Sequence, residues 1–244
     1  MQALATICAA LLWAVLSSLP ARAFVPPPER IAEAVAAANR GAGRFRVLEI
    51  EVALYLGGSE EPAATGKLTS DPGGFSRLEL RDPQGVVERQ LLRGREVLAT
   101  RDRQPLDAPR PLLPPLFLIQ AHSGSALMVS LAALGVSAHE VALGYQGERD
   151  CYVLGGRAPA SGIAAPHPKP ALWVDQETLE AVRFDRGDGV RFRLGPFASF
   201  GSARLPSWIE IADSRGFLAR LAILNAHEAP SSPESFRQGW LGAP

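Results

Sequence analysis

The sequence predicts an α+β protein: a half-open, curved antiparallel β-barrel of about 11–12 strands, with an amino-terminal helix and a short helical lid or plug. Most of the chain consists of short segments that alternate apolar and polar residues, which is the period of a strand with one wet face. The connectors are short and rich in Gly, Pro and Asp, so neighbouring strands should pair antiparallel. One apolar, helix-like run, Leu112–Gly135, interrupts the series.

The first 23 residues predict a cleaved signal peptide. The uncharged apolar segment Ala3–Leu16 is followed by the small-x-small triplet Ala21-Arg22-Ala23, after which cleavage is expected. The apolar segment is shorter than the roughly 20 residues that a membrane-spanning helix needs. We therefore expect export of one mature domain, residues 24–244.

Charge and cysteine content narrow the function classes. The full sequence contains 25 Lys and Arg against 25 Asp and Glu, and only Arg22 would leave with the signal peptide. Such a balance argues against a nucleic-acid partner. Cys151 would be the only cysteine of the mature chain, so no intramolecular disulfide is expected, and its strand-like setting predicts a small buried side chain.

The first element after the signal peptide is a helix. The segment PPPERIAEAVAAANR, residues 26–40, has prolines that suit a first turn, and Ile31, Val35 and Ala38 fall on one face. From Phe45 the period changes to that of strands. The expected strands are Leu48–Tyr55, Thr65–Ser70, Phe75–Arg81, Val86–Leu92, Glu96–Thr100, His139–Tyr145, Cys151–Leu154, Ala171–Asp175, Leu179–Arg186, Val190–Leu194, Ser207–Ala212 and Phe217–Leu224.

The interrupting run divides into two short helices. Pro111, Pro114 and Pro115 prevent a continuous helix, so one helix is expected over Leu116–Ala121 and a second over Ser125–Leu134, which Gly135 ends. The two helices should lie across the concave face or mouth of the curved sheet. There they either fill the barrel as ordinary core or bound an apolar cavity that takes a hydrophobic ligand.

No catalytic or metal-binding constellation stands out. Ser123 and Ser125 lack the Gly-x-Ser-x-Gly setting of a serine nucleophile and are better suited to cap the second lid helix. The four His residues are scattered singly, without the close spacing of metal ligands. We therefore expect no enzyme activity, no catalytic residue, no metal and no cofactor.

The order of these features resembles the lipoprotein-sorting fold of the bacterial periplasm, with the carrier LolA, the receptor LolB and the related RseB sensor domain. The matching pieces are the helix at 26–40, the lid pieces PLFLIQ and LAALG, and the segments DCYVLGG, LWVDQETLEAVRF, LPSWIEI and FLARLAIL. In layout they cover residues 26–236. The resemblance implies an unclosed barrel wrapped around helices and an arginine early in the barrel that latches the lid, for which Arg44 and Arg46 are candidates by position.

The resemblance also implies a soluble periplasmic protein that binds lipid acyl chains or a lipoprotein anchor, for carrying or sorting to the outer membrane, with transient membrane contact. The residues expected to form the hydrophobic cavity and lid are Leu112, Leu116, Phe117, Ile119, Leu127, Met128, Leu131, Trp173, Phe184 and Trp208.

Three alternatives to a carrier stay open. One is an envelope sensor domain that binds a protein partner, and the others are a fully packed structural barrel and a hydrolase using Ser123 or Ser125. The loop Ala158–Pro170 is expected to be an exposed connection, or else a contact to a membrane or partner through Ile163.

Overall fold

The computed structural model describes residues 25–44, 46–156, 169–230 and 233–243. The predicted signal peptide, residues 1–23, lies outside these ranges, and so does most of the predicted loop from Ala158, including Ile163. Export and the role of this loop therefore stay predictions.

The described residues form a 13-stranded antiparallel sheet in the order β6-β5-β4-β3-β2-β1-β15-β14-β11-β10-β9-β8-β7. The strands are β1 (Leu48–Leu56), β2 (Ala64–Asp71), β3 (Phe75–Arg81), β4 (Val87–Arg93), β5 (Glu96–Arg101), β6 (Gln104–Pro105), β7 (Ser137–Gln146), β8 (Arg149–Gly155), β9 (Ala171–Asp175), β10 (Ala181–Asp185), β11 (Arg191–Leu194), β14 (Trp208–Ala212) and β15 (Leu218–Glu228). A separate hairpin contains β12 (Phe197–Phe200) and β13 (Ala203–Pro206).

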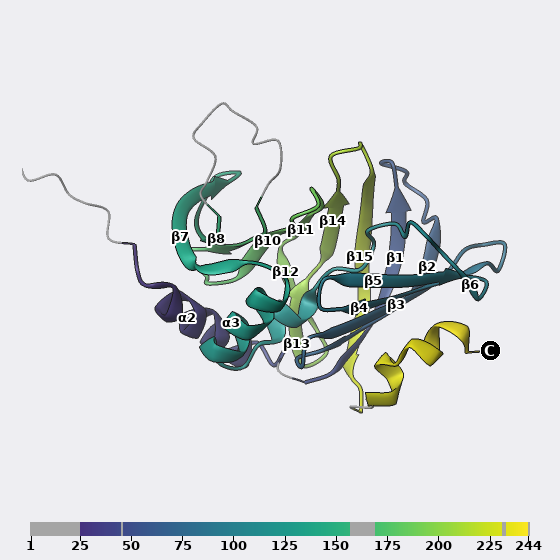
Figure 1. Cartoon of the computed structure of the whole chain (residues 1–244), viewed down its shortest axis with the longest axis horizontal. Helices are drawn as coiled ribbons and strands as arrows, with labels where there is room; N and C mark the ends of the chain where they lie inside the picture. The colour runs from purple at the N-terminus through teal and green to yellow at the C-terminus, as the bar shows by residue number, and fades with distance from the viewer. Residues whose placement is uncertain (1–24, 45, 157–168, 231–232, 244) are drawn as a thin grey trace, which may run out of the picture.

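Pairing of β1 with β15 joins two wings of the sheet, one made of the first strands of the chain and the other of the later ones. The edge strands β6 and β7 are not paired with each other, so the sheet stays open and strongly curved (Figure 1). The predicted fold class is confirmed. The sequence pattern missed β6, which has two residues, and the β12–β13 hairpin, whose four-residue strands are too short to establish a period.

Helices lie on both faces of the sheet. They are α2 (Pro28–Gly41), the 3₁₀ helix η1 (Leu116–Gln120) and α3 (Gly124–Ala133), and two further 3₁₀ helices, η2 (Pro233–Phe236) and η3 (Gln238–Gly242), lie near the carboxyl end. The first helix and both lid helices form where the sequence predicted them. The Ser123 hydroxyl accepts a hydrogen bond from the Ala126 N–H and so caps α3.

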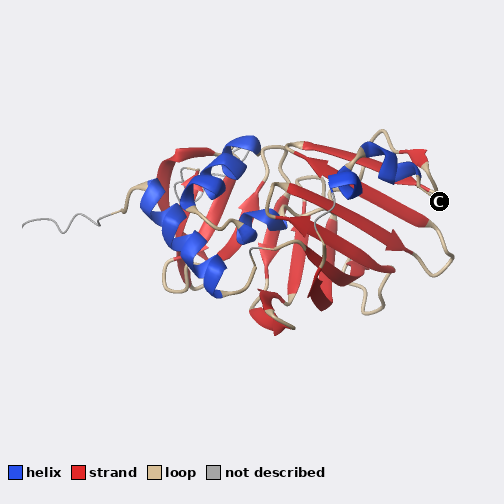
Figure 2. Ribbon diagram, turned by 90° about the horizontal axis from the view of Figure 1, so that it is seen from below, coloured by secondary structure: helices blue, strands red, loops and turns tan. Residues whose placement is uncertain are grey.

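The two faces of the sheet have different cores. The face that packs against α2, η1 and α3, here called the inner face, carries the main core, and Figure 2 shows α2 and α3 lying across it. Leu172 and Ile209 are among its residues. The opposite, outer face carries a smaller apolar cluster formed by Cys151, Val153, Ala171, Trp173 and Val182. Successive residues of a strand point to opposite faces, which is why neighbours such as Leu172 and Trp173 belong to different clusters.

The carboxyl-terminal helices cover the outer face at β3–β5. Phe236 and Leu241 pack with Leu91 of β4, and the guanidinium of Arg77 lies 5.0 Å from the centre of the Trp240 ring. The outer face of this wing is thus covered by the chain's own end. Within the described ranges, no helix has the length and apolar character needed to cross a membrane.

Candidate functional site

A pocket of about 350 Å³ opens where the two wings of the sheet and the lid meet. Its lining residues come from three parts of the chain: Leu92 and Arg95 from β4 and the following turn; Phe184, Arg186, Gly187, Asp188 and Phe192 from the β10–β11 hairpin; and Leu113, Pro115, Leu134 and Pro170 from the lid and a neighbouring segment. Such a volume lies within the usual range of small-molecule sites. We call this cavity the mouth pocket.

The apolar floor of the mouth pocket follows from strand register. Phe184 of β10 and Phe192 of β11 are directly opposite each other in the ladder, and their rings stack with centroids 6.3 Å apart. Residues directly opposite on antiparallel strands project to the same face. Both rings and Leu92 of the other wing are buried in the inner core while they line the pocket.

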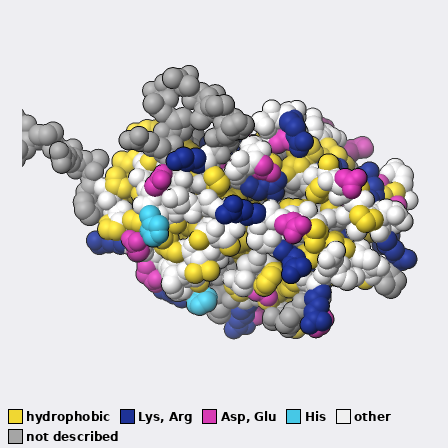
Figure 3. Space-filling view, viewed as in Figure 1, with side chains coloured by type: hydrophobic (Ala, Val, Ile, Leu, Met, Phe, Trp, Pro, Cys, Tyr) yellow, Lys and Arg dark blue, Asp and Glu magenta, His cyan; other side chains and the backbone are white. Residues whose placement is uncertain are grey.

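Three charged side chains, Arg95, Arg186 and Asp188, line the mouth pocket next to the apolar floor. Arg186 donates hydrogen bonds to both carboxylate oxygens of Asp188, one of them over 2.8 Å. Burial alone would raise the pKa of Asp188, but the hydrogen bond and charge of Arg186, together with backbone hydrogen bonds from Val190 and Asp188 itself, outweigh this effect, and the pKa lies below its usual value. Arg95 is exposed, and among the described residues it has no hydrogen bond or ion pair. The face of the molecule drawn in Figure 3 carries a mixture of apolar and charged side chains, without a large patch of one sign.

Most of the predicted lid residues form core rather than pocket wall. Each of Leu112, Leu116, Phe117, Ile119, Leu127 and Leu131 is at most 3% exposed and belongs to the inner core, against which Met128 packs while half-buried. Their neighbours in the chain, Leu113, Pro115 and Leu134, line the mouth pocket. The lid therefore reaches the pocket, but through residues that the sequence pattern did not select.

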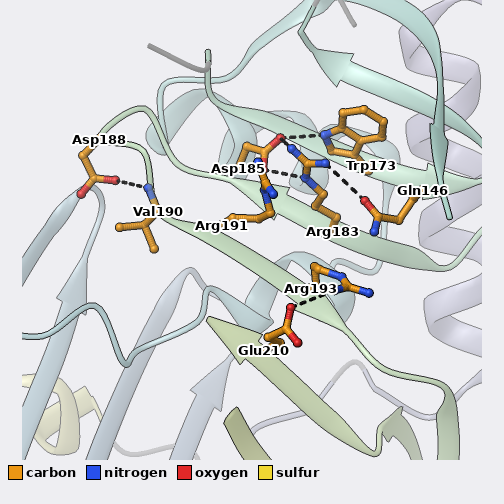
Figure 4. Close-up of polar contacts among 9 residues, drawn as sticks. All are labelled: Gln146, Trp173, Arg183, Asp185, Asp188, Val190, Arg191, Arg193 and Glu210. Carbon is orange, nitrogen blue, oxygen red and sulfur yellow. Dashed lines mark hydrogen bonds and ion pairs between the residues drawn. The ribbon is translucent and has the colours of Figure 1, made fainter. Parts of the chain in front are cut away.

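The three predicted aromatic residues lie in different places. Phe184 lines the mouth pocket, whereas Trp173 lies on the outer face, where its indole N–H donates to Asp185 Oδ2 over 2.9 Å and Arg183 stacks on its ring (Figure 4). Trp208 also lies on the outer face, with the guanidinium of Arg220 5.0 Å from its ring centre. Neither tryptophan lines the mouth pocket.

Polar contacts of buried side chains attach η1 to the sheet and to α2. The buried Gln120 amide donates to the Arg46 carbonyl over 2.7 Å, and its oxygen accepts from the Ser70 hydroxyl. The buried Asn39 amide of α2 donates to the carbonyls of Leu118 and Ala121, over 3.4 and 3.1 Å. Buried polar groups that are satisfied in this way define one position of a segment.

Arg44 contributes to this attachment because it holds the Asn39 side chain. It is 1% exposed, donates to Asn39 Oδ1 over 2.9 Å and to the Arg204 carbonyl over 3.1 Å, and stacks on Phe197. Burial lowers its pKa to about 10, which still leaves it charged at neutral pH. Arg44 thus contacts the lid through Asn39, whereas the Arg46 side chain pairs with Glu228.

The amino end of α3 is attached to α2 at the surface. Glu33 accepts a hydrogen bond from the Gly124 N–H over 2.8 Å and pairs with Arg40, which also donates to the His122 carbonyl. The Gly124 hydrogen bond is the largest of the effects that lower the pKa of Glu33, followed by the Arg40 contacts. Negative charge at a helix amino end is favourable because it opposes the helix dipole.

Cys151, expected to be buried, is fully buried in the outer cluster. Burial raises the pKa of its thiol to about 11, so the thiol is protonated and unreactive at neutral pH. Among the residues that the structure describes, no group of three or more His, Cys, Asp or Glu is placed to hold a metal ion.

Proteins of known structure resemble this chain in fold. No protein-family model matches the chain, and no curated protein matches its sequence. A LolA superfamily protein from Nitrosomonas europaea aligns with 89% of this chain and 100% of its own, at 15% identity and a TM-score of 0.54. A protein described as an outer membrane lipoprotein-sorting domain, from Vibrio parahaemolyticus, aligns with 88% of this chain and 98% of its own, at 11% identity and a TM-score of 0.52.

These two alignments span nearly the whole of both relatives, so the chain has the LolA-like fold. The resemblance that the sequence suggested is confirmed at the level of fold. A chain of the MucA/MucB complex from Pseudomonas aeruginosa aligns with 88% of this chain and 62% of its own length, at 12% identity. Its TM-score of 0.24 is too low to indicate a shared fold.

Proposed function

We propose that this protein binds an acyl chain of a lipid, or of a lipoprotein anchor, in the mouth pocket, and carries or sorts that ligand in the periplasm without transforming it. The main support for the proposal is the pocket itself. Its apolar floor is formed by residues of both wings of the sheet, and one wall is formed by the lid. The LolA-like fold supports it, because the two aligned proteins are named for lipoprotein sorting or for that superfamily.

The physical driving force is burial of apolar surface. Covering about 200 Å² of acyl chain would favour binding by about 5 kcal/mol, before the cost of ordering the chain. The pocket of about 350 Å³ suits one short chain or the end of a longer one. A longer chain needs more room, which movement of α3 away from the inner face would provide.

The lid makes loading reversible in this proposal. Leu134, at the end of α3, lines the pocket, and Leu131 and Leu127 follow it inward along the same helix. If α3 moves outward, these leucines would face the ligand instead of the inner core. When the ligand leaves, they pack again on the core, and this packing offsets part of the cost of emptying the cavity.

The test is native mass spectrometry of protein purified from its own periplasm without detergent, followed by organic extraction. We expect a stoichiometric extra mass that is a lipid or acyl peptide. The variant Leu134→Trp fills the pocket and should lose this mass. Val129→Trp, which adds the same side chain on the solvent side of α3, where Val129 is 70% exposed, should keep it.

Circular dichroism and thermal unfolding must first show that both variants are folded. A mass equal to that of the bare chain, with no uptake of added lipid or acyl peptide, would contradict the proposal. Equal loss in the two variants would also contradict it, because the pocket would then not be the binding site.

The second candidate is an envelope sensor domain that binds a protein partner. It is favoured by β7, an edge strand of the described sheet that carries Leu143 and Tyr145, 41% and 76% exposed. An edge strand offers unpaired backbone groups to a strand of another chain. Loss of an envelope partner in Tyr145→Asp, with lipid binding unchanged, would support this function instead.

A further inference from the structure

We propose that the ligand of the mouth pocket carries an anionic head group, and that Arg95 binds this group. The inference rests on the proposed function and goes one step further, because it names the chemistry of the end of the ligand that faces water. It concerns single-chain amphiphiles with a carboxylate or phosphate head. Its support is the distribution of polarity and charge around the pocket.

The pocket changes from apolar to charged over a short distance. Leu92, Phe184 and Phe192 are each at most 3% exposed and form the floor. Arg95 and Asp188, which also line the pocket, are exposed to solvent. A ligand that matches both parts has an apolar tail on the floor and a polar head at the opening, and this is the pattern of an amphiphile.

The sign of the head group follows from the charges at the opening. Two of the lining side chains are arginines and one is a carboxylate. Asp188 is engaged by both hydrogen bonds from Arg186, so these two charges cancel locally. Arg95 supplies the remaining positive charge. Its guanidinium can donate two parallel hydrogen bonds to a carboxylate or phosphate, which a lysine cannot match.

Arg95 is also placed against the lid. A Cβ added at Gly135 would lie 2.8 Å from the Arg95 guanidinium carbon, so the guanidinium packs on the bare backbone just after α3. Gly135 has a φ of +81°, a backbone conformation that glycine adopts without strain and that other residues adopt only with strain. An anion held by Arg95 would therefore lie between the β4–β5 turn and the end of the lid, where it can bridge the two.

The experiment is calorimetric titration of the detergent-free protein with three compounds: decanoic acid, decanol and acetate. Decanoic acid at neutral pH presents tail and charge, decanol presents the tail alone, and acetate presents the charge alone. We expect decanoic acid to bind about fivefold more tightly than decanol, as for a charge-assisted contact at an exposed site. Added salt should weaken the binding of decanoic acid and leave that of decanol unchanged.

Three variants locate the effect. Arg95→Gln should remove the preference for decanoic acid over decanol, and Arg95→Lys should restore part of it. Arg93→Gln removes an exposed arginine two residues away that does not line the pocket, and it should leave the preference unchanged. Binding of decanol should be equal in all three variants, which also shows that the pocket is intact.

The outcomes separate this inference from the proposed function. If decanol binds as tightly as decanoic acid, or if Arg95→Gln keeps the preference, the inference fails while acyl binding stands. If acetate binds as tightly as decanoic acid, the tail contributes nothing and both fail. If none of the three compounds binds, the proposed acyl site fails, and the inference fails with it.

Discussion

The two lid helices, η1 and α3, are attached to the molecule in different ways. Buried polar side chains hold η1: Gln120 contacts the sheet, and Asn39, which Arg44 holds in turn, donates to carbonyls in the middle of η1 and directly after it. Surface contacts from Glu33 and Arg40 hold the start of α3, and its remaining contacts with the inner face are apolar. Apolar contacts are not directional, so they permit a shift that a buried hydrogen-bond network resists.

Under the proposed function, this difference would make η1 the fixed part of the lid and α3 the part that moves. η1, with five buried residues in a row, acts as a plug of the inner core. α3 has Val129 exposed on its solvent side, and Leu134, directly after the helix, lines the mouth pocket. In the proposed function α3 is the part that would act as a lid, whereas η1 packs as core.

Removing the η1 anchor should have the largest effect on stability. Gln120→Leu removes the buried amide that pairs with the Arg46 carbonyl and the Ser70 hydroxyl, and we expect the free energy of unfolding to fall by about 3 kcal/mol. Denaturant titration measures the change. Gln84→Leu, at an exposed turn position, is the matched control and should change stability by less than about 0.5 kcal/mol. A loss for Gln120→Leu as small as that of the control would mean that η1 is not held by this network.

Removing the cap of α3 should have a smaller effect. Ser123→Ala deletes the hydroxyl that accepts from the Ala126 N–H, and such a loss costs about 1 kcal/mol. Denaturant titration again gives the value, with Ser130→Ala, inside the same helix, as the control. Lipid release should become faster in Ser123→Ala and not in Ser130→Ala if movement of α3 opens the pocket. An unchanged release rate would argue against α3 as the moving part.

The surface contact at Glu33 should give the smallest effect, and one that depends on pH. The pKa of Glu33 is lowered in the folded protein, so its charged form stabilises the fold above the pKa of the unfolded chain. This contribution is lost as the pH falls through the lower pKa of the folded state. Thermal unfolding of wild type and Glu33→Gln should therefore differ at pH 7, and the difference should shrink as the pH is lowered toward 3. A difference that stays constant between these two pH values would show that the charge of Glu33 has no role.

Much of the fold could be predicted from local pattern. The alternation in segments such as Leu48–Leu56 identified most strands, and the prolines before Leu116 together with Gly135 located both lid helices. The open barrel followed from short connectors and the resemblance. β9 shows the limit of this reasoning, because all five of its residues are buried and the pattern cannot tell which face Trp173 takes.

The candidate site could be predicted only in part. The mouth pocket depends on contacts between segments far apart in the chain, such as Leu92 with the β10–β11 hairpin, and no local pattern reports them. The alternation of Arg191, Phe192 and Arg193 opposite Phe184 was the one signal that could have indicated Phe192. Arg95 follows an ordinary turn, Arg93-Gly94, and nothing in the sequence marks it as a pocket residue.

Under the proposed function, acyl chains bind in the mouth pocket and nowhere else on the described surface. The most direct test is photo-crosslinking with an acyl chain that carries a diazirine at its end, followed by peptide mapping. We expect crosslinks to the segments around Leu92, Leu113, Leu134 and Phe192, and their loss in Leu134→Trp. Crosslinks that instead fall on the outer-face groove lined by Tyr55, Leu218 and Arg220, and that persist in Leu134→Trp, would contradict it.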